Sequence, residues 1–295
     1  MTSAIEATDL GKRYGDRWAL RHTTLSVPTG KVVGLVGANG AGKSTLLHLA
    51  VGLLHASEGA MRVLGDRPGR SPDQLAKVGF VAQDAPVYGS LTVGDHLELG
   101  KRLNPSWDAR GAEDRIAAIG LDYRQRAGAL SGGQRSQLAL TLAIGKRPQL
   151  LLLDEPVASL DPLARREFLQ DLMELAADGL SIVLSSHLIE DLERTCDYLI
   201  VLAQGKARLT GDINDIVNEH RIITCPRLTS DNPVGHEVIA RSDTPRQTTM
   251  LARGSQTVLN PTWTVTGVSL EEIVLAYLAQ PAPEPAVLHS VQGVA

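Results

Sequence analysis

The chain has 295 residues, a formal net charge of −4, and a composition that is 43% hydrophobic and 21% charged. That length allows one large domain with an appendage, and the mildly acidic balance excludes the strong basic field of a protein that grips a nucleic-acid backbone. The longest apolar runs fall well short of the ~20 residues that a bilayer-spanning helix needs, and residues 1–10 lack the apolar stretch of a signal peptide. Any membrane role is therefore expected to depend on a separate protein.

The first predicted elements form a strand-rich N-terminal part. Residues 5–10 and 19–27 alternate in polarity and are expected to pair as an antiparallel sheet. A short apolar strand at 31–36 leads through a glycine-rich loop into an apolar helix at 43–54. Two more strands are expected at 61–64 and 78–82.

The middle of the chain, from about 91 to 144, is expected to be mostly helical. Thr92 can cap one helix, with Asp95 in its first turn. Ser131 and Gln134 have the spacing of a capping box, which predicts a helix that runs to about residue 146.

Strands and helices then alternate. An apolar strand at 150–153 is followed by a helix that Asp161 caps and that runs to about 177. Further strands are expected at 180–185 and 199–202. This alternation predicts an α/β fold with a mostly parallel sheet covered on both faces, into which an α-helical subdomain at about 84–145 is inserted.

The amino-acid composition changes after residue 212, where Thr, Pro, Ser and Arg become frequent. Short strands at 237–240 and 262–268 and a helix at 269–279, capped by Ser269, predict a small α+β C-terminal extension over 213–280. Residues 281–295 are proline-rich and expected to be disordered. Because no internal repeat is present, residues 1–212 are expected to form a single nucleotide-binding domain.

Residues 37–44, Gly-Ala-Asn-Gly-Ala-Gly-Lys-Ser, match the phosphate-binding loop pattern between a strand and a helix. Glycines let backbone N–H groups point at phosphate oxygens, and the helix N-terminus adds positive charge. Lys43 is placed to reach the β and γ phosphates, and Ser44 to offer its hydroxyl to Mg²⁺. The pattern predicts an ATP site in a P-loop NTPase core.

A second motif is the apolar strand that ends in Asp154 and Glu155. Acids often terminate strands, so the pair alone is weakly informative. Together with the phosphate loop, Asp154 is expected to hold Mg²⁺ and Glu155 to polarise an attacking water.

A third motif, Leu-Ser-Gly-Gly-Gln-Arg at 130–135, stands directly before a helix. With it the chain resembles the ATP-binding-cassette (ABC) ATPases over about 4–212. Ser131, Gly132, Gly133 and Gln134 correspond to the family signature, a second phosphate site. In that family two domains pair head to tail, and each ATP is held by the loop of one and the signature of the other. The resemblance implies a homodimer or a pair with another ABC subunit.

The resemblance also assigns single positions. Tyr14 resembles the aromatic residue that stacks on adenine, and Trp18 is its competitor for that role. Gln83 resembles the glutamine that contacts Mg²⁺ and the attacking water. Ser159-Leu-Asp161 resembles the loop that contacts the opposite subunit, and Asp161 is also expected to cap a helix. His187 resembles the histidine that binds the γ-phosphate. The candidate ATP-binding residues are Tyr14, Gly37, Asn39, Gly40, Ala41, Gly42, Lys43, Ser44 and Thr45.

The function that the resemblance implies is that of a Mg²⁺-dependent ATPase at the cytoplasmic face of a membrane, driving a separate transmembrane subunit. The short helical region and the small C-terminal extension resemble exporter subunits. The alternative is a soluble ABC ATPase that remodels a nucleic-acid or ribosomal partner. A non-catalytic cassette is disfavoured because Glu155 and His187 are both present.

Residues from about 83 to 103 are expected to contact the membrane subunit. Pro86, Val87, Tyr88 and Gly89 follow Gln83 and place apolar and aromatic side chains on a loop. The alternative is that Tyr88 packs on its own helical subdomain.

Overall fold

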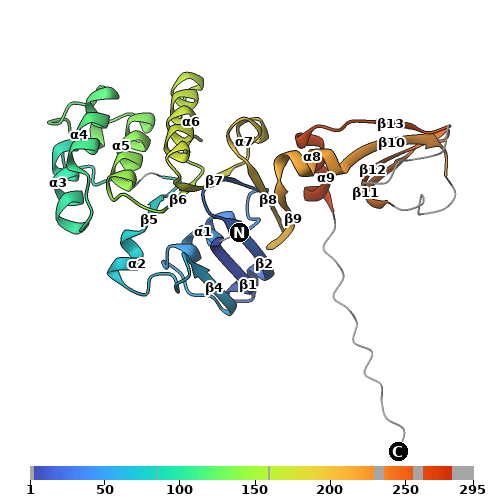
Figure 1. The fold of residues 1–295 in the computed structure, drawn as a ribbon, viewed down its shortest axis with the longest axis horizontal. Helices are drawn as coiled ribbons and strands as arrows, with labels where there is room; N and C mark the ends of the chain where they lie inside the picture. The colour runs from blue at the N-terminus through green and yellow to red at the C-terminus, as the bar shows by residue number, and fades with distance from the viewer. Residues whose placement is uncertain (1–2, 85, 159, 229–235, 255–261, 281–295) are drawn as a thin grey trace, which may run out of the picture.

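The centre of the protein is a six-stranded sheet with the order β5-β6-β7-β3-β8-β9 (Figure 1). The computed structural model describes residues 3–84, 86–158, 160–228, 236–254 and 262–280. The six strands are β3 Val32–Val36, β5 Val78–Val81, β6 Leu150–Asp154, β7 Ser181–Ser186, β8 Tyr198–Ala203 and β9 Lys206–Asp212. All neighbours pair in parallel except β8 and β9, so the predicted mostly parallel sheet is confirmed. The edge strand β9 was not predicted.

Both faces of this sheet are buried, which explains why its strands have nearly continuous apolar sequences. Along β6, Leu150 and Leu152 pack on the side of helix α1, Lys43–Ala50, whereas Leu151 and Leu153 face the other side. On that second side lie helices α5 Gly132–Gly145, α6 Pro162–Ala177 and α7 Ile189–Thr195, and residues of the C-terminal helices join the same core.

The N-terminal sheet has three antiparallel strands in the order β2-β1-β4. They are β1 Ser3–Tyr14, β2 Arg17–Pro28 and β4 Glu58–Val63. The predicted antiparallel pair of strands is therefore confirmed, and the strand expected at 61–64 is the third strand of this sheet. Helix α1 ends four residues earlier than expected, because Gly52 has φ 79° and its backbone packs directly against Gly69.

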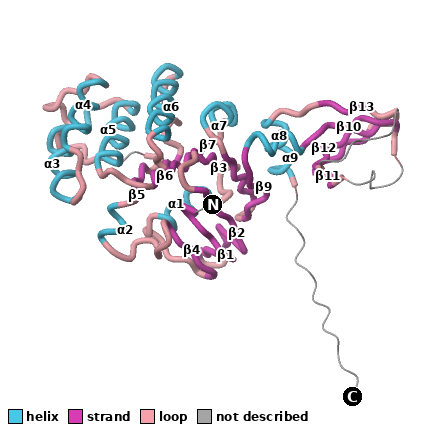
Figure 2. Tube along the Cα trace, in the orientation of Figure 1, coloured by secondary structure: helices cyan, strands magenta, loops and turns pink. Residues whose placement is uncertain are grey.

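The helical middle forms a separate group at one end of the molecule (Figure 2). After the short helix α2, Pro72–Ala76, come α3 Val93–Leu103 and α4 Ala109–Ala118, and these two pack against α5 with their own apolar core. Side chains form complete capping boxes at Thr92 with Asp95 and at Ser131 with Gln134, so both predicted helix starts are confirmed.

The C-terminal part holds a four-stranded antiparallel sheet with the order β11-β12-β10-β13, between helices α8 and α9 in sequence. Its elements are α8 Ile213–Glu219, β10 His220–Pro226, β11 Glu237–Asp243, β12 Gln247–Arg253, β13 Thr264–Thr266 and α9 Leu270–Ala279. The Ser269 capping box at the start of α9 is present as predicted. Residues of α9, among them Ile273 and Tyr277, join the core formed by β8 and α7. The predicted tail at 281–295 lies outside the described residues.

Both cysteines, Cys196 and Cys225, are buried and free, and burial raises the pKa of each thiol. Within the described part of the chain, no helix is both long and apolar enough to cross a bilayer.

Candidate active site

The phosphate loop lies at the C-terminal end of β3, in the middle of the central sheet, and leads into α1. A Cβ atom on Gly37 would lie 2.3 Å from the Leu202 carbonyl oxygen, and one on Gly42 would lie 2.6 Å from that of Ala19. Gly42 also has φ 106°, a conformation that disfavours other residues. The loop therefore needs these glycines, and it leaves the first N–H groups of α1 free of side-chain caps and able to bind an anion.

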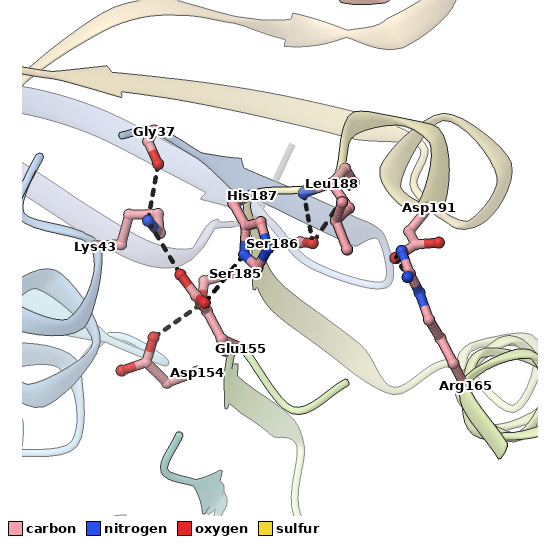
Figure 3. Close-up of polar contacts among 10 residues, drawn as sticks. All are labelled: Gly37, Lys43, Asp154, Glu155, Arg165, Ser185, Ser186, His187, Leu188 and Asp191. Atoms are coloured by element: carbon pink, nitrogen blue, oxygen red, sulfur yellow. Dashed lines mark hydrogen bonds and ion pairs between the residues drawn. The ribbon is translucent and has the colours of Figure 1, made fainter. Parts of the chain in front are cut away.

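Lys43 begins α1, and its side chain turns back over the loop. Its ammonium donates to the Gly37 carbonyl oxygen at 2.8 Å and lies 3.2 Å from Glu155 Oε1 (Figure 3). Only 6% of the side chain is exposed. A cation held at this position suits the phosphate oxygens of a nucleotide.

The two candidate acids lie at the C-terminal end of β6, which is separated from β3 by β7 in the sheet. Asp154 is the last residue of β6 and is 2% exposed, while Glu155 follows with φ 47°, in the left-handed region. His187 comes directly after β7, and its Nδ1 lies 3.1 Å from Glu155 Oε2. The structure thus brings Lys43, Glu155 and His187 together around one carboxylate (Figure 3).

A cavity of about 520 Å³ contains most of the predicted nucleotide residues. It is lined by Tyr14, Arg17, Ala19, Asn39, Gly40, Gly42, Lys43, Ser44, Thr45, Gln83 and Glu155. Gly37, Ala41, Asp154 and His187 do not line it; Ala41 closes the loop turn by donating to the Ala38 carbonyl oxygen at 3.0 Å.

The structure favours Tyr14 over Trp18 as the aromatic residue at this cavity. Tyr14 lines it and is 50% exposed. Trp18 does not line it, and its ring instead contacts the guanidinium groups of Arg13 and Arg21, which lie 5.6 and 5.8 Å from the ring centroid. Arg17, which precedes Trp18 at the start of β2, lines the cavity and was missed, because a single arginine after a turn carries no pattern.

Ser185, near the end of β7 and two residues before His187, was also missed. Its hydroxyl contacts both acid positions, accepting from the Glu155 N–H and donating to Asp154 Oδ1, each at 2.8 Å. A signal existed in the sequence, since two serines interrupt an apolar strand directly before the candidate histidine.

The signature residues form a second surface. Ser131 caps α5, accepting from the Gln134 N–H at 3.2 Å. A cavity of about 840 Å³ is lined by Ser131, Gly132, Gly133, Gln134 and Asp161, together with residues of α4 and α6. It shares no lining residue with the cavity at the phosphate loop.

Asp161 caps α6 by accepting from the N–H groups of Leu163 and Ala164, both at 3.0 Å. The expected cap is therefore present, and the same residue lies at the signature cavity. Ser159, which the expected contact loop includes, lies outside the described residues.

Comparisons with known proteins agree on one family. The family model described as "ABC transporter" matches residues 20–158. The "Nod factor export ATP-binding protein I" of Cupriavidus pinatubonensis is 32% identical over 303 residues, covering 100% of this chain and 86% of that protein. The "Spermidine/putrescine import ATP-binding protein PotA" of Bacteroides thetaiotaomicron is 34% identical over 223 residues, covering 74% of this chain and 48% of that protein.

Solved structures are similar as well. An ATP-binding subunit of an ABC transporter superposes with a TM-score of 0.67 at 29% identity, covering 72% of this chain and 92% of that one. A dimeric bacterial ABC transporter cassette gives a TM-score of 0.64 at 25% identity, covering 70% of this chain and 98% of that one.

Proposed function

Since the chain belongs to the ATP-binding subunits of ABC transporters, which are ATPases, we propose that it powers an exporter by binding ATP between two cassettes and hydrolysing it. We place the ATPase domain at 1–212, and the extension at 213–280. A separate transmembrane subunit would carry the substrate, and the cassettes would act at the cytoplasmic face of its membrane.

One observation carries this proposal: a single chain holds two surfaces built for phosphate, and they are separate. The loop surface has a buried cation and a helix N-terminus, and the signature surface has a capping serine at another helix N-terminus. Because their cavities have no residue in common, one nucleotide contacts both most simply when a second cassette brings its Ser131 to the loop of the first. The dimeric relative supports this arrangement.

The residues around the loop have distinct roles in the proposed reaction. Lys43 and the N–H groups at the start of α1 would hold the β and γ phosphates of ATP. Glu155 would polarise the attacking water, and His187, bonded to the same carboxylate, would contact the γ-phosphate. Tyr14, at the rim of the cavity, would stack on the adenine.

The residues present also suit a magnesium ion. Ser44 and Gln83 supply oxygen atoms in the cavity, and the buried Asp154 directly precedes Glu155, which lines it. Mg²⁺ prefers oxygen and is often bound by one or two protein groups together with substrate phosphates, so this sparse set is sufficient. When bound, the ion would neutralise charge on the phosphates.

A groove next to Gln83 suits the membrane subunit. It has a volume of about 610 Å³ and is lined largely by apolar side chains, among them Leu53, Leu75, Val87, Tyr88 and Leu103. Exposed fractions of 65% for Leu53, 67% for Tyr88 and 70% for Leu103 are high for large apolar side chains. Such a groove can accept an apolar helix of a partner, and it lies where the chain leaves the candidate active site.

Replacement of Tyr88 by alanine tests this groove. The ring stacks on His96 with centroids 6.2 Å apart, but it is 67% exposed, so its loss should cost the isolated subunit less than about 1 kcal/mol of stability. Melting temperature and basal ATPase activity are expected to stay near wild type, while co-purification with the membrane subunit falls.

The matched control is Tyr123→Ala, which changes another tyrosine of the helical region that does not line the groove. It should leave co-purification unchanged. A Tyr88→Ala protein that melts earlier yet assembles normally would favour the alternative, in which Tyr88 only packs on its own subdomain.

The proposal of export rests on one alignment that covers the whole chain. The export-named relative from Cupriavidus pinatubonensis matches 100% of this chain, whereas other export-named relatives match 70 to 76% of it, about as much as the import-named relative at 74%. A strain in which the gene is deleted should accumulate a compound inside cells and lose it from the medium, and a Glu155→Gln copy should not restore it. Untargeted metabolite profiling of both fractions measures this, and loss from the cells instead would indicate import.

A further inference from the structure

We infer that Ser185 is a positioning residue that fixes Asp154 and Glu155 relative to each other for ATP hydrolysis. The inference rests on the proposed roles of these two acids. It assigns a function to a buried hydroxyl that contacts neither the nucleotide cavity nor solvent directly.

The register of the central sheet places the serine beside the acids. Strands β6 and β7 are parallel neighbours, and Asp154 pairs with Ser185 at their C-terminal ends. Ser185 is 0% exposed, and its hydroxyl can donate one hydrogen bond while it accepts others. It donates to Asp154 Oδ1 at 2.8 Å and accepts from the Glu155 N–H at 2.8 Å (Figure 3).

The second of these bonds holds an unfavourable backbone conformation. Glu155 has φ 47°, a region that non-glycine residues avoid. Conformations of this kind persist where surrounding contacts over-determine them, and they cluster at functional sites. Here the hydroxyl of Ser185 anchors the Glu155 N–H, so the turn that aims the Glu155 side chain toward Lys43 and His187 depends on a side chain of the neighbouring strand.

The same hydroxyl orients the Asp154 carboxylate. One oxygen of Asp154 accepts a hydrogen bond from Ser185, which restricts the orientations open to the carboxylate. A bond from a hydroxyl to a charged carboxylate is among the stronger hydrogen bonds in proteins. Without it, both Asp154 and the Glu155 N–H would lose a partner in a nearly water-free position.

Ser185→Ala should therefore lower kcat for ATP hydrolysis by about tenfold, the effect of losing one charge-assisted hydrogen bond. Because Ser185 does not line the nucleotide cavity, the Kd for ATP measured without Mg²⁺ should stay within about twofold of wild type. Ser185→Thr keeps the hydroxyl and should recover most of the lost kcat.

Ser181→Ala is the matched control. Ser181 lies on the same strand, is 3% exposed, and accepts from the Gly30 N–H at 2.9 Å, away from the acids. Both alanine variants lose one buried hydroxyl, so a purely structural role predicts similar falls in melting temperature and similar kcat. We expect the kcat effect only at Ser185.

A double-mutant cycle with Glu155→Gln measures whether the effects of the two substitutions depend on each other. The rate is measured as single-turnover hydrolysis of radiolabelled ATP. Ser185 is inferred to fix the two acids relative to each other, so its effect on the rate requires both of them. Ser185→Ala should therefore change the residual rate of the Glu155→Gln protein by less than about twofold. An undiminished tenfold effect in that background, or equal kcat values for Ser185→Ala and Ser181→Ala, would overturn the inference. Wild-type turnover of Glu155→Gln alone would instead contradict the proposed function.

Discussion

Replacement of Glu155 by glutamine is expected to lower steady-state ATP turnover by about 100-fold or more, while ATP binding is retained. Glutamine keeps the shape of the side chain but cannot polarise water or accept its proton as a carboxylate does. Lys43 loses the negatively charged partner that lies 3.2 Å away, but it keeps its hydrogen bond to the Gly37 carbonyl oxygen. The phosphate-binding loop should therefore stay intact. Phosphate release and equilibrium ATP binding measure the two effects.

The control is Glu193→Gln, which removes an exposed carboxylate on α7 outside the nucleotide cavity. Its turnover should equal wild type. Lys43→Ala should behave in the opposite way to Glu155→Gln, weakening ATP binding itself because it removes a charge-assisted contact. Wild-type turnover in the Glu155→Gln protein would remove Glu155 from the catalytic role.

Replacement of Ser131 by arginine is expected to abolish ATP-driven dimerisation while leaving ATP binding by each monomer intact. The bulky side chain would fill the space at the start of α5 where the opposing γ-phosphate is proposed to lie. It would also remove the acceptor for the Gln134 N–H, which costs about 1 kcal/mol of helix stability. Light scattering after chromatography, in the Glu155→Gln background with ATP, gives the mass directly.

Ser269→Arg is the control, because Ser269 caps α9 through the same capping-box arrangement, with Glu272 as its partner. It should lose a comparable helix cap and still dimerise. A dimer peak that persists in the Ser131→Arg protein would place the signature away from the interface.

The central strands and the chemical motifs could be predicted because their signals are local. Residues 150–153 form an apolar run since β6 is buried on both faces, and the capping boxes at Ser131 and Ser269 mark helix starts by short-range hydrogen bonds. The phosphate loop likewise depends on contiguous glycines. Site residues that belong to such motifs could therefore be proposed from the sequence.

Elements with a weak local pattern, and features that depend on contacts between distant segments, were not predicted. Strand β12 lacks clean alternation, because the buried Thr248 replaces an apolar residue and is satisfied by hydrogen bonds, one of them to Asp243 Oδ1 at 2.5 Å. Helices α7 and α8 have seven residues each, too few for a clear period. Ser185 becomes informative only once β6 and β7 are placed side by side.

The most direct test of a site shared between two chains is to mix two inactive variants. Lys43→Ala damages the loop of its own chain, and Ser131→Arg damages the signature. A mixed dimer then contains one composite site in which both halves are intact. We expect each variant alone to lack ATPase activity and the mixture to regain it. A mixture that stays as inactive as its components would contradict the shared site.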